Sequence, residues 1–112
     1  MTMRWQVLYT VEAQQEFNEL PAREQVAMIH AIDKLAAEGP ALPYPHSSAV
    51  QGADRLRELR LRAGRSAWRA LYRRVGDVFV IAAIGPEAQV DKRGFGRAVA
   101  AAQARLALIE ED

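Results

Sequence analysis

The spacing of apolar residues predicts a strand and two consecutive helices in the first third of the chain. Residues 5–9 are strand formers with an aromatic residue at each end. Thr10 can cap the helix that follows, in which residues 13–20 place apolar side chains on one face. Pro21 is typical of a helix start, and an apolar stripe continues from there until Gly39-Pro40 ends the helix. These segments predict a helical hairpin.

The middle of the chain alternates in a way that predicts strands. Residues 40–54 are rich in proline and serine and indicate a loop. Residues 56–62 alternate between apolar and charged side chains, and residues 67–74 form a second strand-like run. Residues 75–78 supply a turn into residues 79–84, which are apolar throughout, as expected for a strand covered on both sides. The simplest arrangement is a meander of three antiparallel strands.

The end of the chain carries the most regular helical pattern. The segment 86–96 is polar and irregular, and a helical stripe runs through its end to the C-terminus. This helix could pack on the sheet or pair with another helix outside the domain. The apolar residues of the stripe are Phe95, Val99, Ala102, Leu106 and Ile109.

These elements predict an α+β fold, with the order strand, two helices, three strands, helix. We expect a single domain over residues 1–112, in which a helical hairpin and a C-terminal helix pack on a small, twisted, mainly antiparallel sheet. In the simplest form of this sandwich, the helices cover one face of the sheet.

Composition narrows the chemistry. Half of the residues are apolar and about a quarter are charged, as in ordinary globular proteins. The absence of cysteine excludes disulfides, thiolate metal sites and thiol nucleophiles. No apolar run has the length of a membrane span or the pattern of a signal peptide, so we expect a cytoplasmic location and no membrane partner.

The charge is unevenly distributed along the chain. The formal net charge is only +1, yet residues 54–77 hold eight arginines and three acids, a local balance of +5. Eight of the thirteen arginines therefore lie between positions 55 and 74. Such a concentration indicates a polyanion or an acidic protein as partner, although a solvated pair of strands could also carry several arginines.

The usual catalytic constellations are missing. The two histidines, His30 and His46, fall on a helix and in the proline-rich loop, where ordinary helix and loop positions explain them. No group of histidines and acids has metal-ligand spacing, and no phosphate-binding glycine loop is present. We therefore expect neither a metal nor a cofactor.

What remains is arginine on strands. By strand alternation, Glu58, Arg60 and Arg62 point to one side, and Arg69 and Arg73 share a side of the next strand. Guanidinium groups fixed on a rigid sheet can hold a phosphodiester and stabilise the charge of a transition state. Equally, these arginines could be charges on a solvent face, with Glu58 paired across the strands to one of them. The pattern leaves both interpretations open.

The stretch from Gly52 to Ile84 resembles the RelE/ParE toxin superfamily and, within it, the phage-derived HigB-like subgroup. The motifs that carry the resemblance are short but correctly ordered, and the order of elements over the whole chain also agrees. They are Gly52 followed by Leu56-Arg-Glu-Leu-Arg60, then Trp68-Arg-Ala-Leu-Tyr72, then Val78-Phe-Val-Ile81, with an Ala-rich A-x-x-R-L at Ala102 to Leu106.

The resemblance implies roles for individual arginines. Arg69 matches an arginine that contacts the scissile phosphate in RNA-cleaving members, and Arg60 matches a basic position that holds the RNA backbone. Pro86-Glu87 departs from the family, which has basic residues there, so Lys92 and Arg93 are the candidates to replace that charge in the catalytic site. The remaining expected RNA contacts are Arg57, Arg62, Arg73 and Arg97.

The function that the resemblance implies is that of a type II toxin, a metal-independent endoribonuclease that cleaves mRNA on the ribosome and so inhibits translation. Its partners would be the ribosome, mRNA and a cognate antitoxin, expected to be a small helix-turn-helix protein, with which the toxin could form an oligomer. Two alternatives remain: a ParE-like inhibitor of DNA gyrase, and a toxin fold that has lost catalysis and serves as an interaction module.

Overall fold

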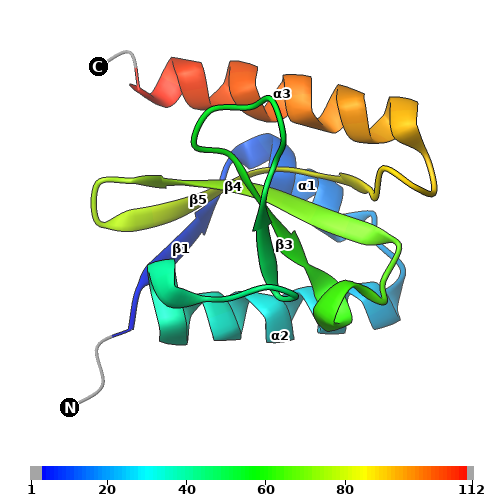
Figure 1. The fold of residues 1–112 in the computed structure, drawn as a ribbon, viewed down its shortest axis with the longest axis horizontal. Coiled ribbons are helices and arrows are strands. Elements are labelled where there is room, and N and C mark those ends of the chain that lie inside the picture. The colour runs from blue at the N-terminus through cyan, green and yellow to red at the C-terminus, as the bar shows by residue number, and fades with distance from the viewer. Residues whose placement is uncertain (1–3, 111–112) are drawn as a thin grey trace.

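The computed structural model describes residues 4–110, so the ends of the expected 1–112 domain lie outside the described part. In Figure 1 a twisted sheet lies between helices, with α2 along one side and α3 along the other. None of the helices in residues 4–110 has the length and hydrophobicity needed to span a membrane. The elements are β1 (Gln6–Tyr9), α1 (Val11–Asn18), α2 (Ala22–Glu38), the 3-10 turn η1 (Gly39–Ala41), β2 (Ser47–Ala49), β3 (Arg57–Arg60), the 3-10 turn η2 (Leu61–Gly64), β4 (Trp68–Val75), β5 (Val78–Pro86) and α3 (Lys92–Glu110).

The sheet contains the predicted meander and two further strands. Its five strands lie in the order β1-β5-β4-β3-β2. Strands β3, β4 and β5 are antiparallel neighbours, as predicted, while β1 pairs with β5 in parallel and β2 pairs with β3. The predicted α+β class and its mainly antiparallel sheet are therefore confirmed.

Two boundaries differ from the sequence-based prediction. The segment 40–54, expected to be a loop, contains the three-residue strand β2. The strand expected to run to Arg62 ends at Arg60, because Leu61 enters η2, where Arg62 and Ala63 adopt left-handed backbone angles (φ 54° and 56°). Arg62 therefore does not continue the strand face of Arg60.

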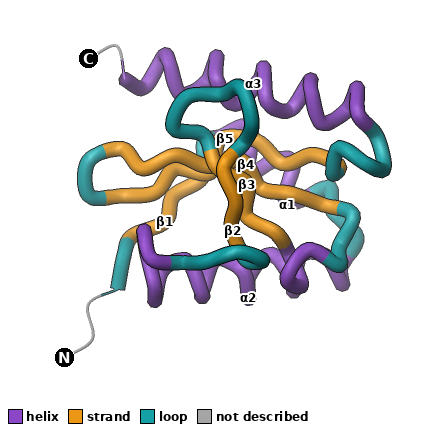
Figure 2. The backbone as a smooth tube through the Cα atoms, in the orientation of Figure 1, coloured by secondary structure: helices purple, strands orange, loops and turns teal. Residues whose placement is uncertain are grey.

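The helices cover both faces of the sheet, so the expectation that they share one face is wrong. Helices α1 and α2 pack on the face that carries Tyr72, and the fully buried Met28 of α2 belongs to this core cluster. Helix α3 packs on the opposite face (Figure 2), and Leu106 and Leu71 belong to the core cluster on that side. The apolar run of residues 79–84 serves both layers, which explains why every one of its side chains is buried.

Helix α3 also begins earlier than its apolar stripe suggests. Strand β5 reaches Pro86, and the helix starts at Lys92, so only residues 87–91 connect them. The Asp91 side chain accepts a hydrogen bond from the Gly94 backbone N–H (2.9 Å), which caps the first turn. The second part of the expected irregular segment 86–96, residues 92–96, therefore already belongs to α3.

Helix α3 approaches the sheet closely at Gly85. A Cβ atom placed on Gly85 would lie 2.6 Å from the Cβ atom of Ala98. Two small residues thus let the helix backbone lie directly over β5. Because the first turn of α3 sets the position of the 87–91 connection, this contact also positions one wall of the site described below.

We expect Gly85→Ala to destabilise the protein by about 1–3 kcal/mol, because the added methyl group overpacks a contact that cannot widen without moving α3. Gly96→Ala is the matched control: it lies in the same helix with open space around it and should stabilise the protein by about 0.5–1 kcal/mol. Urea unfolding measures both values. A Gly85→Ala protein as stable as wild type would contradict the close approach.

Candidate functional site

Arg69 lies buried in a polar cluster at one end of the sheet. It pairs with Arg60 in the register of β3 and β4, and only 2% of its surface is exposed. Its Nε donates to Glu58 Oε1 (3.0 Å) and its Nη2 to Glu87 Oε2 (2.6 Å). Three backbone carbonyls accept its other hydrogen bonds, those of Gly64, Ser66 and Trp68. All five donors of this guanidinium are therefore occupied.

Glu58 joins the two arginines of the cluster. Its Oε1 accepts from Arg69 and also from Arg60 Nη1 (3.3 Å), while its Oε2 has no hydrogen-bond partner within residues 4–110. A carboxylate held on one oxygen by two guanidiniums has a fixed orientation. The second oxygen is left free to interact with a bound molecule.

Arg60, unlike Arg69, keeps donors available. Its Nε donates to the Pro45 carbonyl (3.0 Å), and its side chain is about one-fifth exposed. Its Nη2 makes no hydrogen bond with any part of the chain that the structure describes. The guanidinium also lies 5.2 Å from the centre of the Tyr44 ring, close enough for a cation–π interaction.

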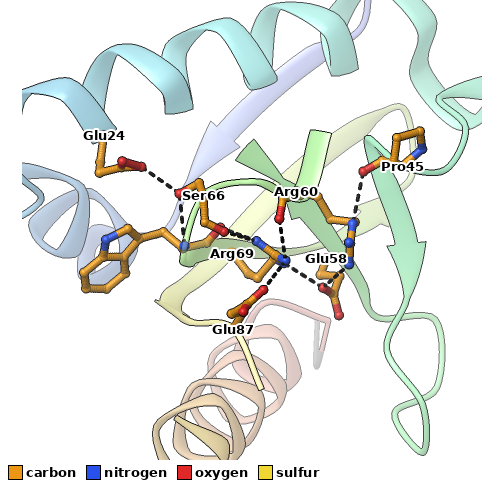
Figure 3. A network of polar contacts seen from close by, with 9 residues as sticks. Glu24, Pro45, Glu58, Arg60, Ser66, Arg69 and Glu87 are labelled. Carbon is orange, nitrogen blue, oxygen red and sulfur yellow. Dashed lines mark hydrogen bonds and ion pairs between the residues drawn. The ribbon is translucent and has the colours of Figure 1, made fainter. Parts of the chain in front are cut away.

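These groups line an open pocket of about 370 Å³ between β3, β4 and the connection that follows β5. Figure 3 shows Glu58 and Glu87 on two sides of Arg69, with Arg60 next to Glu58. Two positive and two negative side chains thus meet in one place. Besides these four, the lining residues are Gly64, Ala88 and Gln89.

The kinked turn η2 builds one wall of this pocket. Leu61 is fully buried and anchors the turn, and the left-handed residues that follow reverse the chain so that Gly64 faces the arginines. A Cβ atom on Gly64 would lie 2.6 Å from Arg60 Nη2. Glycine is therefore favoured here by its backbone angle (φ 93°), and a larger residue would also displace the end of the Arg60 side chain.

Arg62 belongs to a different contact. Its Nη1 donates to both carboxylate oxygens of Glu24 on α2, the shorter distance being 2.9 Å. Glu24 is buried and also accepts from the Ser66 hydroxyl (2.6 Å). The pair fastens the turn η2 to α2, so Arg62 lies apart from the pocket of Arg69.

Arg57 and Arg73 also lie away from this pocket. Arg57 points to the opposite face of the sheet, where its Nε donates to the Ser47 hydroxyl (3.0 Å). Arg73 is buried under the end of α3 and donates to Glu110 (2.7 Å). This hydrogen bond, aided by Arg55, holds the pKa of Glu110 below its usual value. The contact between Arg73 and Glu110 fastens α3 to β4.

The three expected cations of α3 are exposed and do not line the pocket of Arg69. Lys92 and Arg93 lie in the first turn of the helix, and no acidic partner is found for them within the described residues. Arg97 lines a separate depression beside Pro86 and Glu16. Of the eight expected site residues, only Arg60 and Arg69 line the pocket of Arg69.

The residues that sequence reasoning missed are the acids. Glu58 was expected only as a cross-strand partner, an expectation that its contact with Arg69 confirms. Glu87 was expected only as a departure from the basic residues of the family, and its contact with Arg69 could not be foreseen because the connection after β5 carries no periodic signal. Within residues 4–110, no three histidine or acidic side chains lie close enough to hold a metal ion.

Comparison with known proteins places this geometry in a family context. A family model described as phage-derived protein Gp49-like matches residues 15–84, more than half of the chain, including β3 and β4. No curated protein matches the sequence. Among solved structures, a free-state mutant of the E. coli toxin RelE, in which two arginines are replaced by alanine, has a similar fold. The TM-score is 0.63 with 16% sequence identity, and the match covers 88% of this chain and 97% of that one.

The family match and the shared fold agree with the resemblance carried by the β3 and β4 motifs. The chain is a member of the phage-derived Gp49-like family, and it has a fold similar to that of the E. coli toxin RelE.

Proposed function

We propose that this protein is the toxin of a toxin–antitoxin system and that it cleaves mRNA on the ribosome without a metal. The observation that carries the proposal is the pattern of hydrogen bonds made by the Glu58 carboxylate. One of its oxygens is fixed by Arg60 and Arg69, and the other is free at the wall of an open pocket. The pocket therefore holds a positioned proton acceptor beside a guanidinium with spare donors.

The proposed reaction is an internal transesterification of RNA. The free oxygen of Glu58 takes the proton of a ribose 2′-hydroxyl, and the 2′ oxygen of the ribose attacks the adjacent phosphorus. The bond from phosphorus to the 5′ oxygen breaks, which leaves a 2′,3′-cyclic phosphate and a 5′ oxygen that takes a proton from water. Arg60 donates to the non-bridging oxygens, whose negative charge grows in the transition state.

In this scheme Arg69 is a positioning residue. Its five donors are occupied, so it has none left for a phosphate unless Glu87 moves away. It holds Glu58 in place and balances its charge. This assignment differs from the role that the family resemblance implies for Arg69, which is direct contact with the scissile phosphate.

The ribosome and an antitoxin complete the proposal. The pocket offers two carboxylates but no separate acid, so much of the rate enhancement would come from the ribosome, which would hold the mRNA in an attacking geometry. The antitoxin would cover the basic region with acidic side chains. We expect it to be a small helix-turn-helix protein encoded next to this chain.

The saturation of Arg69 favours one alternative, a toxin fold that serves only as an interaction module. If Arg69 must contact phosphate for cleavage, its two carboxylate partners would block that step. A protein of this kind would bind its antitoxin normally and leave mRNA intact on programmed ribosomes.

Substitutions in the pocket separate the roles of the two arginines. We expect Arg60→Ala and Glu58→Gln each to lower the rate of mRNA cleavage by about 10²–10³, because each removes a group that acts in the transition state. Arg60→Ala should change the free energy of unfolding by less than about 1 kcal/mol. Arg69→Ala should cost about 3 kcal/mol or more, because it leaves Glu87 without a cation and Glu58 with only Arg60 as partner.

The measurements are cleavage on ribosomes programmed with a defined mRNA and urea unfolding of each purified variant. Lys92→Ala with Arg93→Ala is a suitable comparison, because it removes two charges outside the pocket and should leave the rate at saturating ribosome concentration unchanged. Full activity of Arg60→Ala would contradict the proposed site. An Arg69→Ala protein as stable as wild type would contradict the structural role of Arg69.

The cellular target can be tested by expressing the chain alone. We expect growth to stop because translation stops, so incorporation of labelled methionine should fall before incorporation of labelled thymidine. The Glu58→Gln variant, expressed at the same level, should leave both rates unchanged. If DNA synthesis falls first, inhibition of DNA gyrase is the better explanation.

A further inference from the structure

A second pocket, lined mainly by basic side chains, lies beside the pocket of Arg69, which we call the cleavage pocket from here on. The second pocket lies between α2 and the segment that leads through β3 into η2. It is a groove of about 290 Å³, and we call it the α2 groove. No acidic side chain lines it. The residues that line it are Arg23, Val26, Ala27, His30, Ala31 and Lys34 on α2, and His46, Arg60, Arg62 and Ala63 on the other side.

The groove keeps positive charge that the protein does not neutralise itself. Arg62 is paired with Glu24, and Arg60 shares Glu58 with Arg69. Arg23 and Lys34, in contrast, have no acidic partner within residues 4–110 and are exposed. They lie three turns apart on α2, so two free cations are spaced along the length of the groove.

An exposed aromatic side chain stands next to this charge. Tyr44 is 69% exposed, and its ring lies against the guanidinium of Arg60. Most tyrosines of a folded protein bury part of the ring, so an exposed ring beside a basic groove requires an explanation. Aromatic rings next to cationic grooves are the arrangement that binds single-stranded nucleic acid, with a base stacked on the ring and phosphates on the cations.

Arg60 connects the groove with the cleavage pocket, because it lines both. A strand whose phosphate is held by Arg60 in the cleavage pocket can therefore continue into the groove without leaving the surface. An acidic peptide would satisfy the cations as well, but it would leave the exposed ring of Tyr44 without a stacking partner.

We propose that the α2 groove binds the sugar–phosphate backbone of single-stranded RNA, with one base stacked on Tyr44, and leads the strand through Arg60 into the cleavage pocket. The direction of the strand rests on the proposed function, whereas binding in the groove does not require that cleavage occurs.

The test uses a short, fully 2′-O-methylated RNA, which cannot be cleaved, and measures its binding by fluorescence anisotropy over a range of salt concentrations. Arg23→Ala with Lys34→Ala should raise the Kd about tenfold and reduce the slope of log Kd against log salt by about 1.4, the value for two lost phosphate contacts on a single strand. Tyr44→Ala should also raise the Kd about tenfold, whereas Tyr44→Phe should not. Arg55→Ala with Arg74→Ala, which removes two exposed arginines outside the groove, is the charge-matched control and should change neither value by as much.

Each outcome decides the proposal. A groove variant that binds RNA with the affinity and salt dependence of wild type would overturn it, as would an equal loss in the control. Loss of antitoxin binding with unchanged RNA binding would assign the groove to a protein partner. If wild type binds RNA through the groove but never cleaves mRNA on ribosomes, the proposed nuclease fails while the groove proposal stands.

Discussion

The burial of one positive charge, that of Arg69, organises the end of the sheet where the pocket lies. A buried guanidinium is costly unless every donor finds an acceptor. Arg69 satisfies this demand with five acceptors drawn from β3, η2, the start of β4 and the connection after β5. These segments lie within 18 residues of Arg69 along the chain but belong to different elements, so the arginine fixes their relative positions. The pocket is a consequence of this constraint, because its walls are the segments that Arg69 holds.

The same constraint separates two arginines that look equivalent in the sequence. Arg60 and Arg69 face each other in register on neighbouring strands, and each contacts Glu58. Arg69 lies below the turn η2 and is saturated, whereas Arg60 lies at the pocket's edge with donors to spare. Arg69 thus has a structural role and Arg60 a chemical one, because they differ in burial and in the number of free hydrogen-bond donors. Neither property is encoded in the alternation of a strand.

Much of the fold followed from local patterns. Thr10 caps α1 as predicted, its hydroxyl accepting from the Ala13 N–H, and the alternating runs gave the antiparallel meander. What failed depended on distant contacts. The three-residue strand β2 exists only because β3 lies beside it, and the parallel pairing of β1 with β5 joins segments about seventy residues apart. The apolar run of residues 79–84 indicated that this strand is covered on both faces. The expectation that the helices share one face of the sheet was inconsistent with that indication.

For the site, strand parity was enough to bring Arg60, Arg69 and Glu58 together, but not to give their burial. That depends on the left-handed residues of η2 and on Glu87, which follows the last strand without any periodic signal. Arg62 was misplaced for the same reason. Its left-handed backbone turns it away from the strand face and toward Glu24, a partner thirty-eight positions earlier.

The concentration of arginines in the middle of the chain therefore does not translate into a basic strand face. Acids from other parts of the chain neutralise much of it: Glu24 pairs with Arg62, Glu87 with Arg69, and Glu110 with Arg55 and Arg73. The paired arginines of this stretch hold α2, the 87–91 connection and α3 to the sheet. Uncompensated charge remains at several cations in different parts of the chain, among them Arg23 and Lys34 on α2, in a half of the chain whose own balance is negative. The electrostatic surface that a polyanion would meet is thus set by which arginines are paired, and a count of charges along the sequence cannot locate it.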